Sequence, residues 1–473
     1  MKDKAKGVII LSVLASFYIY AGSCSAANYY VAADAEPGGD GTPEKPWNSF
    51  GFALQVIPED ADSLIVKDGV YTDTLSISKK FKKHLVIKAE NPGRARIINE
   101  EGERVQLISS SGSNFTLEGF EVTNLSGRGE YLVLLTGNNA QNIVLKNNIF
   151  HDSFHNDMVK INAGAHNITV TGNIFYNMPQ ENYGVQFLDV NVVYNVVIQD
   201  NIFFTNYKQP PFNAASSHIV IKNSTQTRAI TKDITVQRNI FLNWQGKSDQ
   251  PFLLLGEDAW PFYEAEEIMV QNNLFLGNSK VPIEAAFGVK GCRGITFRAN
   301  TVSGDLPCGG WAYATRINRE GKNLVLKDIY FYNNIWADPT GTMKRFSCGG
   351  KKDSENVIYK NNLYWNGGKD IPGDCQGQFC SVADDPKALT ADPLLNYDQE
   401  NIIFPEWDFS KKSFSSGNKT IREEFERLVN KYGAFKENSP ARGKAEQENM
   451  PAEDILGNPR GKNPDIGAFN LSK

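Results

Sequence analysis

The chain has 473 residues, of which 41% are hydrophobic and 22% charged, and its formal net charge is -5. This balance excludes a disordered chain and argues against a nucleic-acid-binding protein, which needs a basic surface. The 40 glycines and 11% aromatic residues are typical of a turn-rich β protein rather than a helical bundle.

Residues 1–27 are predicted to be a signal peptide. Three lysines precede an apolar stretch over residues 7–20, and small residues follow it. The stretch is shorter than the ~20 residues that cross a bilayer, and no later stretch is long enough, so no transmembrane segment is expected. Two alternatives stay open: cleavage before Asn28, which gives a secreted or periplasmic protein, and lipidation of Cys24, which gives a lipoprotein.

The next predicted element is a short helix over residues 49–57. Phe50, Ala53, Leu54 and Ile57 form an apolar stripe at helical spacing. We expect this helix to cap the N-terminal end of the fold.

A short phrase that contains one asparagine recurs through residues 146–364. The residues before each asparagine alternate between apolar and polar, as in Ile168-Thr169-Val170, which indicates short strands. Repeats of this length with irregular insertions predict a solenoid, here a parallel β-helix. An asparagine tolerates a left-handed backbone and can bond to its equivalent one coil away. The aligned residues are Asn148, Asn173, Asn201, Asn239, Asn273, Asn300, Asn334 and Asn362.

Five cysteines follow in the C-terminal half of the chain. An exported chain can keep disulfides, and the spacing of these cysteines matches no zinc motif, so a structural role is expected. The local pairings left open are Cys292–Cys308, and Cys375–Cys380 or Cys348–Cys375.

A second helix is predicted over residues 420–432. Thr420 and Glu423 form a capping box, and Gly433 stands at the end. Its buried face would be Ile421, Phe425, Leu428, Val429 and Tyr432. We expect an irregular C-terminal tail over residues 396–473 that packs on a β-helix domain over residues 28–395.

Three parts of the sequence resemble the right-handed parallel β-helix proteins of the pectate-lyase-like superfamily. They are the entry segment at residues 29–47, the phrase at residues 66–71 and the ending at residues 439–469. The resemblance implies that fold over nearly the whole mature chain, with roughly a dozen coils. It leaves the activity open, because this superfamily includes lyases, hydrolases, epimerases and proteins that are not enzymes.

In such solenoids the strand after a variable loop lines the binding groove. Alternation within these strands places one set of polar side chains outward: Lys160, Asn162, Gln186, Lys222, Glu284 and Arg316. The loops before the strands add His151, Asp152, His155, Asn156, Asp157 and Tyr183. The alternative interpretation is an ordinary solvated sheet face.

The phrase Asp157–Ile161 is similar to the strand of chondroitinase-B-like lyases that carries their catalytic lysine. This similarity implies β-elimination on a uronate polysaccharide, with Lys160 as the base, His155 or His151 assisting, and Arg316 or a metal at the sugar carboxylate. That family's arginine-histidine-glycine phrase and its calcium-binding glutamates are absent. Asp152 and Asp157 are the candidate oxygen ligands for calcium.

The remaining candidates concern substrate binding and other chemistries. Trp260 would stack on a sugar, and the substrate-binding set is Asn156, Tyr183, Gln186, Lys222, Trp260 and Glu284. Hydrolysis needs paired aspartates, and the sequence offers only Asp384-Asp385 in a late loop. The Asp-Pro-His-Gly phrase of mannuronan epimerases is absent, which disfavours epimerisation.

The sequence therefore favours an exported, monomeric polysaccharide lyase that acts on a uronate-containing glycan. The alternative is a non-catalytic β-helix that binds glycans or has a structural role at the cell surface. Convergence of His151, His155, Asp157, Lys160 and Gln186 in one cleft would favour the enzyme.

Overall fold

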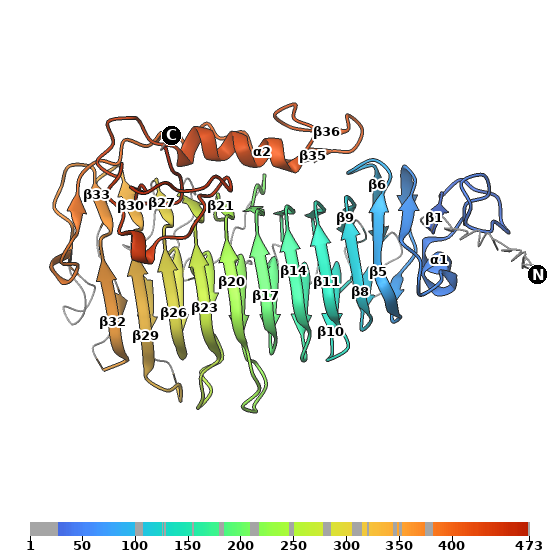
Figure 1. Cartoon of the computed structure of the whole chain (residues 1–473), viewed down its shortest axis with the longest axis horizontal. Coiled ribbons are helices and arrows are strands. Elements are labelled where there is room, and N and C mark those ends of the chain that lie inside the picture. Colours follow the sequence, from blue (N-terminus) through green and yellow to red (C-terminus); the bar gives the residue numbers. More distant parts are fainter. Residues whose placement is uncertain are drawn as a thin grey trace, which may run out of the picture.

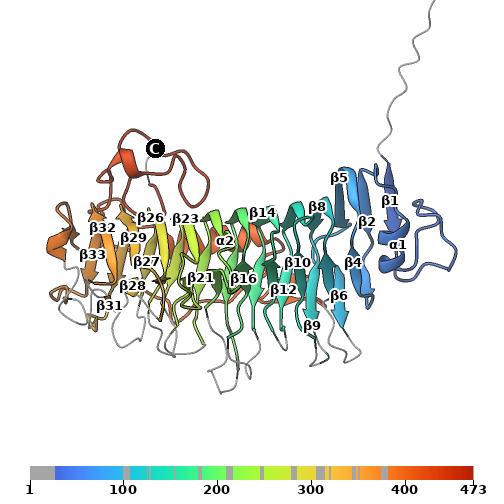
Figure 2. The same cartoon turned by 90° about the horizontal axis from the view of Figure 1, so that it is seen from below.

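A computed structural model of the chain describes residues 27–99, 107–124, 126, 129–153, 156–178, 184–208, 217–245, 250–277, 285–304, 315–318, 321–343, 348–349, 352–373 and 382–471. Three parallel sheets run along the molecule, and each complete coil adds one short strand to each sheet (Figures 1 and 2). The fold is a right-handed parallel β-helix, as predicted.

Within the described residues, sheets A and B have 12 strands each, and sheet C has 10. Sheet A contains β1 (Asn28–Val31), β2 (Ser63–Val66), β5 (Lys80–Ala89), β8 (Ser113–Glu118), β11 (Gln141–Lys146), β14 (His166–Thr171), β17 (Tyr194–Gln199), β20 (Lys232–Gln237), β23 (Ala265–Gln271), β26 (Cys292–Arg298), β29 (Leu326–Tyr332) and β32 (Ser354–Lys360). Sheet B contains β3 (Gly69–Tyr71), β6 (Ala95–Asn99), β9 (Glu121–Asn124), β12 (Ile149–His151), β15 (Ile174–Tyr176), β18 (Ile202–Phe204), β21 (Ile240–Leu242), β24 (Leu274–Leu276), β27 (Thr301–Ser303), β30 (Ile335–Asp338), β33 (Leu363–Asn366) and β34 (Leu389–Thr390). Sheet C contains β4 (Leu75–Ile77), β7 (Ile108–Ser110), β10 (Val133–Thr136), β13 (Val159–Asn162), β16 (Leu188–Asn191), β19 (Ile219–Lys222), β22 (Leu253–Leu255), β25 (Phe287–Lys290), β28 (Thr315–Asn318) and β31 (Cys348–Gly349).

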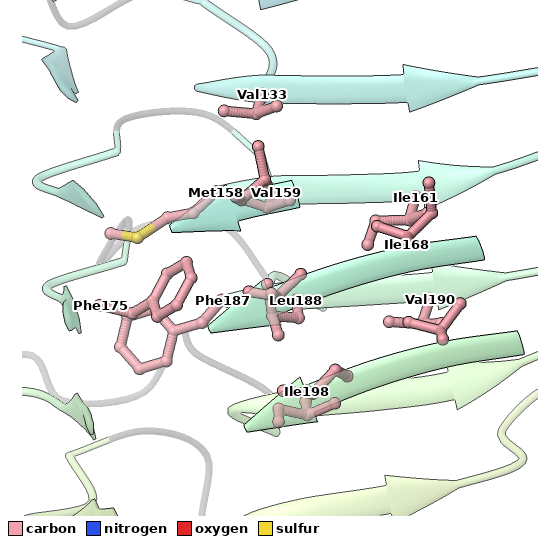
Figure 3. Close-up of a cluster of buried hydrophobic side chains, with 14 of the residues drawn as sticks. Val133, Met158, Val159, Ile161, Ile168, Phe175, Phe187, Leu188, Val190 and Ile198 are labelled. Atoms are coloured by element: carbon pink, nitrogen blue, oxygen red, sulfur yellow. The ribbon is translucent and has the colours of Figure 1, made fainter. Parts of the chain in front are cut away.

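The interior of the solenoid is filled by the alternate side chains of all three sheets. In sheet C, Val159 and Ile161 of β13 and Val190 of β16 point inward and pack together (Figure 3). The sheet B phenylalanines Phe150, Phe175, Phe203, Phe241 and Phe275 stack coil upon coil, with ring centroids 4.5–5.0 Å apart. The spacing equals the ~4.8 Å rise between parallel strands, so every coil repeats the same contact.

The predicted asparagine ladder forms the buried turn between sheets A and B. From Asn173 onward, each side-chain oxygen accepts from the backbone and side-chain N–H groups of the asparagine one coil earlier, as between Asn239 and Asn201. Asp385 ends the ladder, because its carboxylate accepts both N–H groups of Asn362. The left-handed backbone falls one residue earlier than expected: Asn147 has a φ of 53°, whereas Asn148 does not lie in that region.

The N-terminal helix α1 spans Phe50–Val56, and Ser49 caps it. Its Phe50, Ala53 and Leu54 are buried in the solenoid core, and it lies at the N-terminal end of the coils (Figure 1). Its function as a cap stays a prediction.

The C-terminal helix α2 (Ile421–Leu428) begins with the predicted capping box and continues as one π-helical turn, Val429–Gly433. It lies alongside the coils with the antiparallel pair β35 (Trp407–Asp408) and β36 (Ser413–Phe414) (Figure 1). Short 3-10 turns occur at Val382–Asp384 and Gln447–Asn449. The predicted apolar face of α2 packs on outward residues of sheet B, among them Ile202 and Leu274. The domain boundaries stay a prediction.

Several expectations fall outside the described residues, including the leader and Cys24. Cys292 is a free, fully buried thiol that contacts the Lys290 carbonyl oxygen at 3.2 Å, so the predicted Cys292–Cys308 bridge is wrong. The side chains of the other four C-terminal cysteines are not described. In the described part of the chain, no helix has the length and apolar character to cross a membrane. Export and the monomeric state stay predictions.

Candidate functional site on sheet C

The register of sheet C brings a lysine and an aspartate from adjacent coils together. Lys160 of β13 pairs with Asp189 of β16, and both point outward because their strand neighbours fill the core. The Lys160 ammonium lies 2.5 Å from an Asp189 oxygen and 3.4 Å from an oxygen of Asp157. Because both oxygens contact one nitrogen atom, they lie within about 6 Å of each other.

Backbone and side-chain groups hold this cluster in place. The Gln186 backbone N–H donates to Asp157 at 2.9 Å. The Asn156 side chain accepts from the Asp157 backbone N–H and donates to the Tyr131 hydroxyl at 3.3 Å. The Tyr131 ring lies 5.5 Å from the Lys160 ammonium, a cation–π distance. Lys160 therefore has two carboxylates and an aromatic ring around its charge.

The cluster shifts the pKa values of Lys160 and Asp157. Burial alone would lower the pKa of Lys160, but the nearby Asp189 and Asp157 raise it, so this lysine keeps its proton. Burial, with the negative charge of Asp189 adding to it, raises the pKa of Asp157 to about 7. At neutral pH, Asp157 can therefore exchange a proton while Lys160 remains a cation.

A second ion-pair group continues the cluster one coil further. Lys222, at the end of β19, pairs with Glu257 and lies 3.9 Å from Asp258. Burial opposes the charge of Lys222, but Asp189, Glu257 and Asp258 raise its pKa. The loop that carries Glu257 and Asp258 is fixed by Glu264, whose buried carboxylate accepts their two backbone N–H groups at 2.8 and 2.9 Å.

His151 does not join the cluster on sheet C. It ends β12 in sheet B, where its ring contacts Glu121 at 3.0 Å and Asp152 at 2.7 Å and stacks on Tyr176. Burial would lower the pKa of His151, but these two carboxylates raise it to about 9. Arg96 donates one hydrogen bond to each oxygen of the buried Glu121 carboxylate. His151 and Glu121 are buried, and the Tyr176 hydroxyl accepts from the backbone N–H of Trp407 in the C-terminal tail.

The other predicted site residues have mixed outcomes. Gln186 is 1% exposed, its side chain donates to the Gly184 carbonyl oxygen at 2.7 Å, and it reaches the cluster through its backbone N–H. Trp260 lies in the loop fixed by Glu264, and its carbonyl oxygen accepts from Asn323 at 3.0 Å. Arg316 lies on β28 of sheet C, but its side chain is not described. His155, Tyr183 and Glu284 lie outside the described residues.

The predicted calcium ligands do not come together. The Asp152 carboxylate contacts His151, whereas that of Asp157 contacts Lys160 and Gln186. Across the described ranges, no three His, Cys, Asp or Glu side chains form a group that could hold a metal. Calcium needs six to eight oxygen ligands, and the described contacts hold these two carboxylates in separate places, so calcium binding stays a prediction and the chemistry that we propose uses side chains alone.

Sequence analysis missed two members of the site and one pairing. Asp189 and Tyr131 were not among the candidates, and the sequence offered no paired aspartates on the groove strands. The structure corrects this, because Asp157 and Asp189 share Lys160 across 32 residues of sequence. The pair that the sequence did offer, Asp384-Asp385, is not a groove site, because Asp385 ends the asparagine ladder.

No protein-family model matches this sequence, and no curated protein sequence is similar to it. Solved structures do resemble it. A crystal structure of pectate lyase Pel9A has a TM-score of 0.54 at 15% identity, covering 94% of this chain and 96% of that one. The GH136 lacto-N-biosidase from Eubacterium ramulus has a TM-score of 0.52 at 11% identity, covering 77% and 67%. At these identities the likeness shows the fold alone, a right-handed parallel β-helix of the pectate-lyase-like type.

Proposed function

We propose that this protein is a carbohydrate-active enzyme that cleaves a uronate-containing polysaccharide by β-elimination on the outer face of sheet C. The observation that carries the proposal is the Lys160–Asp157–Asp189 cluster. Lys160 stays protonated at neutral pH, and the Asp157 carboxyl group beside it has a pKa of about 7, which suits proton transfer at that pH. The fold shared with Pel9A and the lacto-N-biosidase adds support by analogy only.

In this mechanism Lys160 is the partner of the sugar carboxylate rather than the base, which departs from the sequence-based prediction. Its raised pKa opposes proton loss, and its contact with Asp157 is the longer of its two. When the Lys160 side chain turns toward the sugar carboxylate, its ammonium leaves the Asp157 carboxylate, which is then free to accept a proton. The C5–H proton passes to Asp157, its electron pair forms the C4=C5 double bond, and the C4–O bond breaks. The leaving oxygen takes its proton from water.

The same carboxylates favour one second candidate, hydrolysis. Retaining glycosidases place two carboxyl groups about 5–5.5 Å apart, one as the acid and the other as the nucleophile. Asp157 and Asp189 approach within about 6 Å, and Asp157 has the raised pKa of an acid. The products separate the two mechanisms, because only elimination leaves an unsaturated uronate.

The test incubates the purified chain with polygalacturonate, alginate and chondroitin sulfate, with and without calcium. Ultraviolet absorbance reports elimination, and release of reducing ends without absorbance reports hydrolysis. Asp157→Asn should lower kcat by about 10²–10⁴-fold, and Lys160→Ala should raise KM for the charged substrates. Lys146→Ala is the matched control, because Lys146 forms an outward ion pair with Glu118 on sheet A at 2.9 Å. Binding of these glycans without cleavage would instead support the non-catalytic alternative.

A further inference from the structure

The outer face of sheet C is open on one side of the cluster and closed on the other. One register row crosses this face, one residue per coil, in the order Ser76, Ser109, Leu134, Lys160, Asp189, Val220, Leu254 and Gly288. The first four residues are exposed or half-buried. Asp189 is 2% exposed, and Val220 and Leu254 are both fully buried. The change in exposure therefore occurs at the Lys160–Asp189 contact.

Val220 and Leu254 are buried outside the solenoid interior. Their strand neighbours, such as Ile219 and Ile221, belong to the interior core, whereas Val220 and Leu254 do not. At the next coil, a methyl group on Gly288 would lie 2.8 Å from the Pro251 side chain and 2.9 Å from that of Leu254. Along this register row the outer face at this end is therefore filled, and the row offers a chain of sugars no surface to lie on; in the adjoining outward row, Lys222 is 13% exposed and pairs with Glu257.

The spacing of the coils limits how far a substrate can pass the cluster. Adjacent parallel strands are about 4.8 Å apart, so the apolar wall begins one strand spacing beyond Asp189. That distance leaves room for about one sugar ring. On the other side, three successive coils, those of β4, β7 and β10, present small or half-exposed residues that a glycan can cover.

From this asymmetry we infer that the site binds the end of a polysaccharide chain. This inference rests on the proposed function and adds that cleavage starts at the end of the polysaccharide chain. The chain lies over β4, β7 and β10, its terminal residue reaches Lys160 and Asp189, and the wall at Val220 and Leu254 stops it. Cleavage then releases one short product at a time from the chain end, because an internal segment cannot continue past the wall.

The first experiment follows the sizes of the products over time on the polymer that the chain cleaves. Chain-end cleavage gives the shortest products from the earliest time, while the polymer peak keeps its size and the viscosity falls slowly. A ladder of intermediate sizes with an early fall in viscosity would overturn the inference and leave the proposed function standing.

A second experiment places a large side chain on the open side, two coils from Lys160. Ser109→Trp should raise KM for the polymer roughly tenfold, because the side chain occupies the surface on which the glycan lies. Thr169→Trp is the control, because Thr169 is an outward, half-buried residue of sheet A. An unchanged KM for Ser109→Trp would overturn the inference.

If no polymer is cleaved, the proposed function fails, and binding of the same polymers decides the inference. Weaker binding by Ser109→Trp than by Thr169→Trp would support a glycan on the open side of sheet C. Equal binding by the two variants, or no binding by the wild-type chain, would overturn it.

Discussion

The buried asparagine ladder should carry a large part of the stability of each coil, and Asn239→Ala tests this. Asn239 is fully buried, and its side chain makes four hydrogen bonds, to Asn201 N and Nδ2, Ile198 O and Asn273 Oδ1. Alanine removes all four and leaves at least two buried N–H groups of Asn201 without an acceptor. An orphaned buried polar group costs about 1–3 kcal/mol, so the variant should lose about 2–6 kcal/mol of unfolding free energy.

The matched control is Asn195→Gly at the exposed start of β17. Asn195 donates to Asn167 at 2.6 Å and has a φ of 53°, a conformation that glycine adopts without strain. Because that hydrogen bond is exposed, its loss should cost about 1 kcal/mol or less. Urea unfolding followed by circular dichroism and tryptophan fluorescence measures both variants, and coincident curves verify a two-state transition. A cost for Asn239→Ala within 1 kcal/mol of that control would refute the reasoning.

Three further predictions follow from the charged and buried groups. For elimination, kcat should rise as the pH passes about 7, because Asp157 must lose its proton to act as the base; a fall over the same range would indicate hydrolysis with Asp157 as the acid. The raised pKa of His151 should stabilise the fold by roughly 3 kcal/mol below pH 6.5, and this contribution should be lost as the pH rises through about 9. Urea unfolding at about pH 6 and 10 measures this loss, and an equal loss in His151→Gln would contradict it. Burial raises the pKa of the Cys292 thiol and shields it, so it should be labelled only as the chain unfolds in urea, and Cys292→Ser should remove this slow labelling phase; a slow phase that persists unchanged in the variant would contradict this.

The parts of the fold that depend on one residue type in every coil could be predicted from the sequence. The ladder position requires an amide that accepts and donates at once, so Asn148 and its equivalents repeat visibly along the chain. Helix α2 has its own local signal, a capping box and an apolar stripe. Both signals lie within a few residues of sequence.

The site could be predicted only in part, because its members depend on the strand register. Around β16, Val185, Phe187, Leu188 and Val190 are all buried, so the alternation breaks between Phe187 and Leu188, where the loop enters the strand. A strand counted from Val185 places Gln186 outward, whereas the true strand places Asp189 outward. A shift of one residue exchanges the two faces, which explains the omission of Asp189.

The contrast between sheets A and C gives a physical reason to place function on sheet C. The outward row of sheet A runs through Val144, Thr169, Val197 and Thr235, half-buried residues that suit a β-strand in any coil. At Lys160 and Asp189, the sheet C row changes to a charged pair that is largely withdrawn from water. Replacing a buried ion pair with apolar residues is often neutral or stabilising, so the presence of this pair is weak evidence of a contribution to stability. A charged pair that interrupts the repeat without an evident gain in stability is expected where the chain binds or transforms a ligand.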